Sequence, residues 1–181
     1  MKNLLEIVKS MANNPIHQYV VPGLTSELVG GEGHGMVRLF TTDRNSREWI
    51  TPHSHRFDFS CLVLNGIVDN IIFKPSEHGD SYAIGFMRRS STTHGEYDIT
   101  RTGVPEVYEE FQNRYQSGDT YSMKADEIHS IRFSRGASVL FFEGPEVTDR
   151  SVFLEPFSNG KAVETFETKP WMFSKVASEH M

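Results

Sequence analysis

The stretch FSCLVLNGIVDNIIF, residues 59–73, constrains the fold of this chain more than any other segment. Two apolar runs flank Asn65 and Gly66, and Asn-Gly is the pair preferred in two-residue type I′ turns between antiparallel strands. The runs are short and rich in β-branched residues, which is typical of buried strands. The segment therefore predicts a β-hairpin that turns at Asn65 and Gly66.

Short segments of the same kind follow along the chain, separated by turn signals. We expect further strands at residues 36–41, 81–87, 120–125, 127–133 and 137–143. Residues 22–35 contain several glycines and predict a loop, while residues 105–115 fit either a short helix or a pair of strands. Many short strands with turns between them favour an all-β sandwich or barrel.

One segment has a clear helical pattern. Leu4, Ile7, Val8 and Met11 recur at the spacing of one helix face, which predicts an amphipathic helix over residues 2–12. We expect this helix to pack against the sheet and to carry no chemistry of its own.

The length of 181 residues fits a single domain, residues 1–181, with its barrel at about residues 36–145. Residues 147–181 are expected to form a tail that lies back on the barrel. The aromatic side chains of this tail are Phe153, Phe157, Phe166, Trp171 and Phe173.

Charge and composition exclude several classes of function. A net charge of −6 is a poor match for phosphate backbones, so nucleic acid is not an expected partner. No apolar run is long enough to span a bilayer, so no membrane partner is expected, and the first residues lack the pattern of a signal peptide. Cys61 is the only cysteine, which excludes an internal disulfide. A reducing cytoplasm is therefore the expected compartment.

Two histidines, His53 and His55, stand just before the predicted hairpin. Residues i and i+2 of a strand face the same side, and the parity of this pair continues to Phe59, so both imidazoles are expected to face the apolar interior. His129 shares its parity with Ile131 and is expected to face the same interior. Buried imidazoles repel one another when protonated and lack partners when neutral, and a metal ion removes both problems. The three histidines therefore predict a metal site inside the barrel.

The spacing of these histidines resembles the two motifs of the cupin superfamily. The HSH triplet at residues 53–55, followed by Gly66, resembles the first motif, and Gly118 with His129 eleven residues later resembles the second. The resemblance covers about residues 36–145. It implies a double-stranded β-helix barrel that holds a metal ion at its mouth.

The chain departs from the usual cupin pattern at two places. The Pro-x-Gly that usually precedes the last histidine is replaced by Lys-Ala-Asp at residues 124–126. The glutamate usually found four or five residues after the second histidine is replaced by Phe59 and Ser60. Asp58 is close, but on a regular strand it points away from the histidines and would ligate only if a bulge turned it inward. The simplest expectation is a three-histidine site with open positions for water, dioxygen or substrate.

The stretch HSHRFDFSCLVLNG also resembles the three-histidine thiol dioxygenases, such as cysteine dioxygenase, with the cysteine offset by one place. This resemblance implies iron(II) as the metal. Three imidazoles also suit zinc, nickel, copper and manganese. The Ser-x-His-x-Tyr triad of those enzymes is missing, because Val139, Phe141 and Glu143 stand in its place. The arginine that grips the substrate carboxylate in that family has a candidate in Arg38.

The sequence thus predicts a metal-dependent enzyme, first of all an iron(II) dioxygenase that acts on a small polar molecule such as a thiol. Glu143 ends an apolar strand and is a candidate general base, and an inward-facing Arg38 would be an anion clamp. A metal-assisted isomerase or lyase, with Glu143 or Asp58 as the base, and a non-catalytic ligand-binding barrel are the alternatives. A small-molecule substrate is the expected partner, and a homodimer is the expected assembly if the chain associates.

Several further side chains have plain structural interpretations. A buried Cys61 is predicted to be inert packing. Tyr115 and Tyr121 either line the mouth or pack in the core. Three histidines are predicted to be exposed loop residues: His34, His78 and His94.

Overall fold

The computed structural model describes residues 2–17, 19, 22–31, 35–44, 49–89 and 97–163. One helix, α1 (Lys2–Met11), precedes a series of strands. The strands are β1 (Asn13–His17), β2 (Leu24–Gly30), β3 (Val37–Thr42), β4 (Phe57–Asn65), β5 (Ile67–Arg89), β6 (Tyr97–Gln116), β7 (Thr120–Met123), β8 (Ile128–Phe133), β9 (Ser138–Glu146), β10 (Arg150–Ser158) and β11 (Lys161–Ala162). In the described residues the fold is all-β apart from α1, as the sequence predicts.

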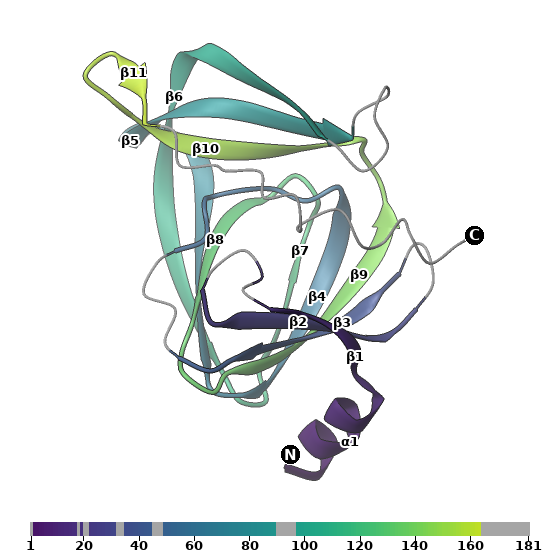
Figure 1. Ribbon diagram of the computed structural model, residues 1–181. Coiled ribbons are helices and arrows are strands. Elements are labelled where there is room, and N and C mark those ends of the chain that lie inside the picture. The colour runs from purple at the N-terminus through teal and green to yellow at the C-terminus, as the bar shows by residue number, and fades with distance from the viewer. Residues whose placement is uncertain are drawn as a thin grey trace.

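Two antiparallel sheets build the barrel. The six-stranded sheet has the order β1-β2-β3-β9-β4-β7, and the five-stranded sheet has the path β11-β10-β5-β6, with β8 also paired to β5. Figure 1 shows these strands wrapped around a common interior, while α1 lies outside the barrel at its lower end. The architecture is a cupin-like barrel.

The predicted hairpin at Asn65 and Gly66 is wrong. β4 and β5 do follow each other directly, but β4 pairs with β7 and β9, whereas β5 pairs with β6, β8 and β10. Gly66, with a φ of 80°, is instead a corner where the chain passes from one sheet to the other. The Asn65 side-chain amide donates to the Gly136 carbonyl at 2.8 Å, and the Ile67 amide donates to the Ser134 hydroxyl at 2.9 Å. These bonds hold the corner against the turn at residues 134–136. The strands β4 and β5 therefore do not pair with each other as a hairpin.

One segment predicted as a loop contains a strand, and one segment left open lies within a strand. Residues 22–35, predicted as a loop, contain β2, whose inward positions Leu24 and Ser26 are 2% and 0% exposed. A serine at a fully buried position breaks the apolar alternation, which is why the pattern hides the strand. Residues 105–115, left open between a helix and a strand pair, lie within the single long strand β6.

The segment predicted as a tail begins with a strand of the second sheet. β10 pairs with β5 over seven consecutive positions, and Phe153 and Leu154 are 1% and 0% exposed. Phe153 is therefore a core residue of the barrel. The expectations for Phe166, Trp171 and Phe173 fall outside the described residues.

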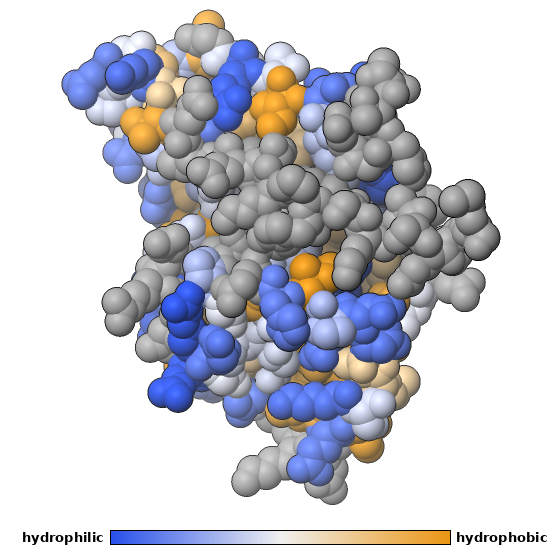
Figure 2. Space-filling model, in the orientation of Figure 1, coloured by the Kyte–Doolittle hydropathy of each residue, from blue (hydrophilic) through white to orange (hydrophobic). Residues whose placement is uncertain are grey.

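The interior is apolar, and α1 covers a second apolar surface. The main core cluster includes Leu24, Phe59, Cys61 and Phe141. On the outer side of the six-stranded sheet, Val8 of α1 packs in a cluster with three leucines of that sheet. This confirms the predicted helix and its packing. Figure 2 shows that hydrophobic side chains also reach the surface over α1, at the lower end of the view.

Candidate metal centre

The three histidines come from two distant segments that the backbone joins directly. His129 lies in β8, whereas His53 and His55 lie in the irregular segment just before β4. The His53 amide donates to the His129 carbonyl at 2.8 Å, and the His129 amide donates to the His53 carbonyl at 2.9 Å. The Ser54 amide donates to the Val152 carbonyl at 2.7 Å, so this segment is held between β8 and β10.

The imidazoles of His53, His55 and His129 converge as the sequence predicts. One ring nitrogen from each lies within 4.8 Å of the others, and the ring centroids are 4.8 to 5.2 Å apart. The Nε2 atoms of His55 and His129 are 3.0 Å apart. Two nitrogens that each lie about 2.1 Å from one ion, at a right angle, are separated by about this distance.

In two of the three imidazoles, the Nδ1 atom donates a hydrogen bond to an oxygen atom. His129 Nδ1 donates to Asn70 Oδ1 at 2.9 Å, and His53 Nδ1 donates to the Thr51 carbonyl at 2.8 Å. In the neutral rings this leaves the Nε2 lone pair for a ligand. Such partners fix the tautomer and the orientation of metal-binding histidines. The donor set therefore fits a metal ion.

Burial also keeps these histidines in the form that binds metal. It lowers the pKa of His53, and it lowers the pKa of His55 and His129 well below the usual histidine value. The neighbouring imidazoles add to this effect, because a second positive charge is unfavourable nearby. The cluster is thus neutral at neutral pH, and a metal ion does not have to displace protons from it.

Aromatic rings surround the imidazole cluster. Phe59 lies 4.6 Å from the His55 ring and 5.6 Å from the His129 ring, between centroids. Phe57 and Phe141 lie 5.4 and 6.2 Å from the His55 ring. Phe59 and Phe141 are buried, whereas Phe57 and His55 are partly exposed. The cluster therefore sits where the apolar interior meets the open end of the barrel.

Asp58 does not join the cluster. A register shift does interrupt the β4–β9 pairing at this position, yet the carboxylate accepts hydrogen bonds from Lys124 Nζ at 2.6 Å and from the Ala125 amide at 2.9 Å. These two donors hold the pKa of Asp58 below its usual range. Asp58 is engaged on the outer surface and is not a base or ligand of the interior.

Arg38 and Glu143 share the inner face of the barrel. Arg38 has the parity of Phe40, a neighbour of the main core, and Glu143 has the parity of Phe141. Both are partly buried. Burial raises the pKa of Glu143, and the positive charges of Arg38 and Arg56 partly offset this rise. The structure thus places both predicted residues on the face of the six-stranded sheet that also carries Phe141, a neighbour of the His55 ring.

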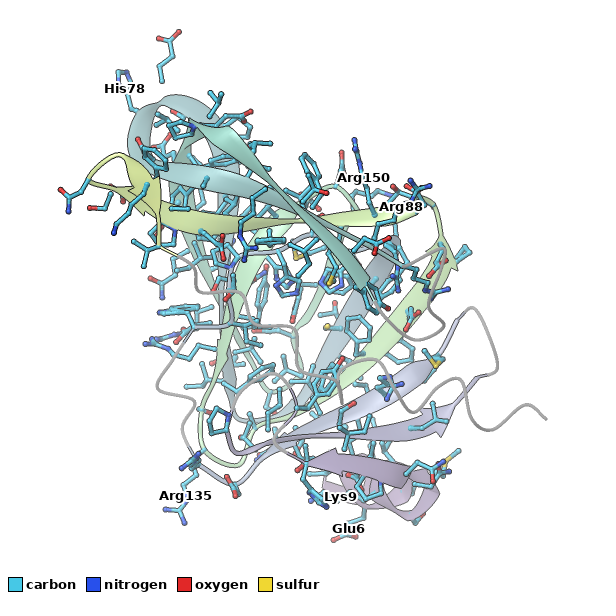
Figure 3. All side chains as sticks on the ribbon, turned by 45° about the horizontal axis from the view of Figure 1, so that its top comes forward. Glu6, Lys9, His78, Arg88, Arg135 and Arg150 are labelled. Carbon is cyan, nitrogen blue, oxygen red and sulfur yellow. The ribbon has the colours of Figure 1, made fainter. Side chains whose placement is uncertain are left out.

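The other side chains that the sequence analysis singled out do not belong to the histidine cluster. Cys61 is 3% exposed, and burial raises the pKa of its thiol to about 12, in agreement with inert packing. Tyr115 and Tyr121 stack at 4.4 Å between centroids and belong to the core. His78, predicted to be an exposed loop residue, is exposed but lies within the strand β5, so the loop prediction is wrong (Figure 3). His34 and His94 fall outside the described residues.

A pocket of about 430 Å³ reaches His55 from the outer side of the barrel wall. It lies between the segment at 54–58, the turn at 124–126 and the segment at 147–152. Charged groups of both signs line it: Asp58, Lys124, Asp126 and Arg150.

Asn70 is the feature of the site that the sequence prediction missed. It is 0% exposed and faces the interior from β5, with its amide 3.6 Å from the sulfur of Met123. Its signal in the sequence is an amide at an inward position of the apolar run IVDNIIF. Buried polar groups are retained only with partners, so such a residue points to a polar neighbour inside the barrel.

We expect Asn70→Leu to lower the affinity for zinc by about 10- to 100-fold, because the His129 ring then lacks its acceptor. Asn70→Asp retains an acceptor oxygen and should bind zinc more tightly than the leucine variant. The measurement is a competitive titration against a chelating dye. Asn113→Leu is the matched control, since Asn113 pairs with Asn70 on the neighbouring strand but is exposed. Equal zinc affinity in the Asn70→Leu and Asn113→Leu variants would show that Asn70 does not support the site.

Comparison with known proteins gives structural matches with low TM-scores. No protein-family model and no curated protein matches the sequence. Among solved structures, an oxalate decarboxylase of Lactobacillus farciminis has a TM-score of 0.43 at 10% identity, over 75% of this chain and 32% of its own. KdgF from Halomonas sp. has a TM-score of 0.41 at 16% identity, over 74% of this chain and 90% of its own. The CENP-C cupin domain of Drosophila melanogaster has a TM-score of 0.40 at 13% identity, over 68% and 70%.

The chain thus spans about a third of the length of the oxalate decarboxylase that it matches. Because all three TM-scores are low, the assignment of fold and site depends on the strands and residues of this chain. These define an all-β cupin-like barrel with a three-histidine group suited to a metal ion. Within the described residues, no helix is both long and apolar enough to cross a membrane.

Proposed function

We propose that this protein is a metal-dependent enzyme in which His53, His55 and His129 hold one iron(II) ion for the oxidation of a small organic substrate by dioxygen. The single observation that carries the proposal is the convergence of three neutral imidazoles at the apolar mouth of the barrel. In the described residues the cluster contains no carboxylate, so three ligand positions come from the protein and the others remain open to small molecules.

Iron(II), when bound, supplies redox chemistry with dioxygen. The protein contributes the rest of the site. Asn70 and Thr51 hold two of the imidazoles in one tautomer and one orientation. Phe57, Phe59 and Phe141 exclude water from one side of the cluster, which lowers the local dielectric constant and protects reactive species from side reactions.

Arg38 and Glu143 have distinct roles in this proposal. The guanidinium of Arg38 binds an anionic group of the substrate. The carboxyl group of Glu143, with its raised pKa, accepts or returns a proton at one of its oxygens. Zinc, nickel or manganese could occupy the same three imidazoles, and metal analysis of the purified protein distinguishes them.

A metal-assisted isomerase or lyase is the second candidate. The partial burial and raised pKa of Glu143 favour it, since a carboxylate in such surroundings is a stronger base than one in water. Asp58, the other candidate base, is paired with Lys124 on the outer surface and does not act on the interior.

Oxygen uptake by the iron-loaded protein tests the proposal. The protein is reconstituted with iron(II) under anaerobic conditions and then assayed with a panel of thiols and organic acids. We expect oxygen consumption with at least one compound and none with the His129→Ala variant. Substrate turnover in the absence of oxygen would favour the isomerase or lyase instead. Stoichiometric iron without turnover of any kind would contradict an enzymatic role and favour a ligand-binding barrel.

A further inference from the structure

The inner wall of the barrel carries a continuous series of aromatic rings that starts at the histidine cluster. Phe59 contacts the His55 ring, and Phe141 lies 4.9 Å from Phe59 between centroids. Phe40 lies 5.5 Å from Phe141, and the ring of Tyr19 stacks on Phe40 at 5.6 Å. These residues come from four separate segments of the chain. The rings therefore form one wall, defined here as the aromatic wall, that leads away from the metal centre.

Arg38 lies at the far end of this wall. It pairs with Phe141 across the β3–β9 ladder and shares the inner face with Phe40. Burial raises the pKa of Tyr19 and of Glu143, and the positive charge of Arg38 offsets part of this rise in both groups. The wall thus connects a cluster of neutral imidazoles at one end with a guanidinium at the other.

The guanidinium of Arg38 is held by neutral groups. It donates to the Ser26 hydroxyl at 3.3 Å and lies 3.8 Å from the sulfur of Met36. Among the described residues no carboxylate lies within 4.0 Å of Arg38, although six other arginines of the described chain form ion pairs within that distance. A partly buried arginine with only neutral partners retains its capacity to bind an anion in bidentate geometry.

We infer that the natural ligand of this interior is an organic acid with a flat apolar body, an aromatic acid above all. Its acid group binds Arg38, its body lies against Phe40 and Phe141, and its other end faces the three histidines. The inference deepens the proposed function and rests on it for the role of the metal. It narrows the substrate class from small polar molecules to aromatic acids.

The chemistry of the wall distinguishes this class from the alternatives. A flat ring gains stacking and edge-to-face contacts with the phenylalanines, whereas a short polar chain would lose its hydration without gaining partners. A neutral aromatic compound would leave Arg38 without its anion. Only a ligand with both features satisfies the two ends of the wall.

Binding of simple probes tests the inference. The probes are 3-phenylpropionate, its neutral amide and butyrate, titrated calorimetrically into metal-free and zinc-loaded protein. We expect 3-phenylpropionate to bind the wild type about 10- to 100-fold more tightly than either of the other probes, since a charge-assisted hydrogen bond and ring contacts are both present. Arg38→Met should remove the preference for the acid over the amide, and Phe40→Leu should reduce the preference for 3-phenylpropionate over butyrate.

Two controls keep the result separate from the proposed function. Arg135→Met removes an exposed arginine in the turn between β8 and β9 (Figure 3) and should bind all probes as the wild type does. Zinc stoichiometry is measured for every variant, and Arg38→Met should retain it. Equal affinity for the acid and the amide in the wild type, or an unchanged preference in Arg38→Met, would overturn the inference. If the wild type did not bind zinc, the metal site would be overturned. The probe titrations of metal-free protein would still test the preference for an aromatic acid.

Discussion

Replacing His129 with alanine should abolish stoichiometric metal binding. The variant loses one of three imidazole ligands and also leaves Asn70 without the ring that donates to it. Removal of a partner outside the ligand set already costs about 10- to 100-fold in affinity, so loss of a ligand should cost more than about 100-fold. Elemental analysis of protein purified without chelators, compared with the wild type, measures the effect.

Two further variants make this result specific. His55→Ala removes a partly exposed ligand and creates less of a cavity than the loss of buried His129, so it separates loss of metal from loss of fold. His78→Ala removes an exposed histidine at the far end of the sheet and should retain the metal of the wild type (Figure 3). One full equivalent of metal in a folded His129→Ala or His55→Ala variant would refute the ligand assignment.

Gly85→Ala should be among the most destabilising single methyl additions in this chain. A Cβ atom at Gly85 would overlap the ring of Phe153, a residue that is 1% exposed. Gly85 and Phe153 pair directly across β5 and β10, so neither strand can move away without breaking the ladder. Overpacking of this kind costs about 3 kcal/mol in free energy of unfolding. The measurement is a urea unfolding curve.

The matched control is Gly30→Ala. Gly30 also lies in a strand, but a Cβ atom there meets no atom within 4 Å. We expect a change in the free energy of unfolding of less than about 0.5 kcal/mol. Because His53 forms a bridge with Phe153, the Gly85→Ala variant should also bind zinc less tightly than the Gly30→Ala variant. Similar unfolding midpoints for the two variants would contradict the packing argument.

The fold class was predictable because most strands carry their own signal. The runs near residues 59–73 and 137–143 are apolar and bounded by turn residues, so local pattern sufficed. The partners of those strands were not predictable. Asn65 and Gly66 satisfy every local requirement of a hairpin, and only the bonds to Gly136 and Ser134 show that they form a corner. The strand β2 was not predicted, because the buried Ser26 interrupts the alternation of apolar and polar residues along it.

The site was more predictable than the topology. Parity placed His53, His55 and His129 on one inner face, although the first two precede β4 and do not lie on a regular strand. The prediction succeeded because backbone hydrogen bonds and isolated bridges hold this segment between β8 and β10. The contact between Asn70 and His129 and the arrangement of the aromatic wall could not be predicted from parity, because both depend on which strands lie side by side.

The reciprocal backbone bonds between His53 and His129 have a consequence for biosynthesis. The two halves of the ligand set are separated by most of the barrel in sequence, and each is oriented by the other. A nascent chain that has not yet emerged beyond residue 129 therefore lacks the third imidazole of the cluster. The ligand set can therefore come together only after β8 has been synthesised.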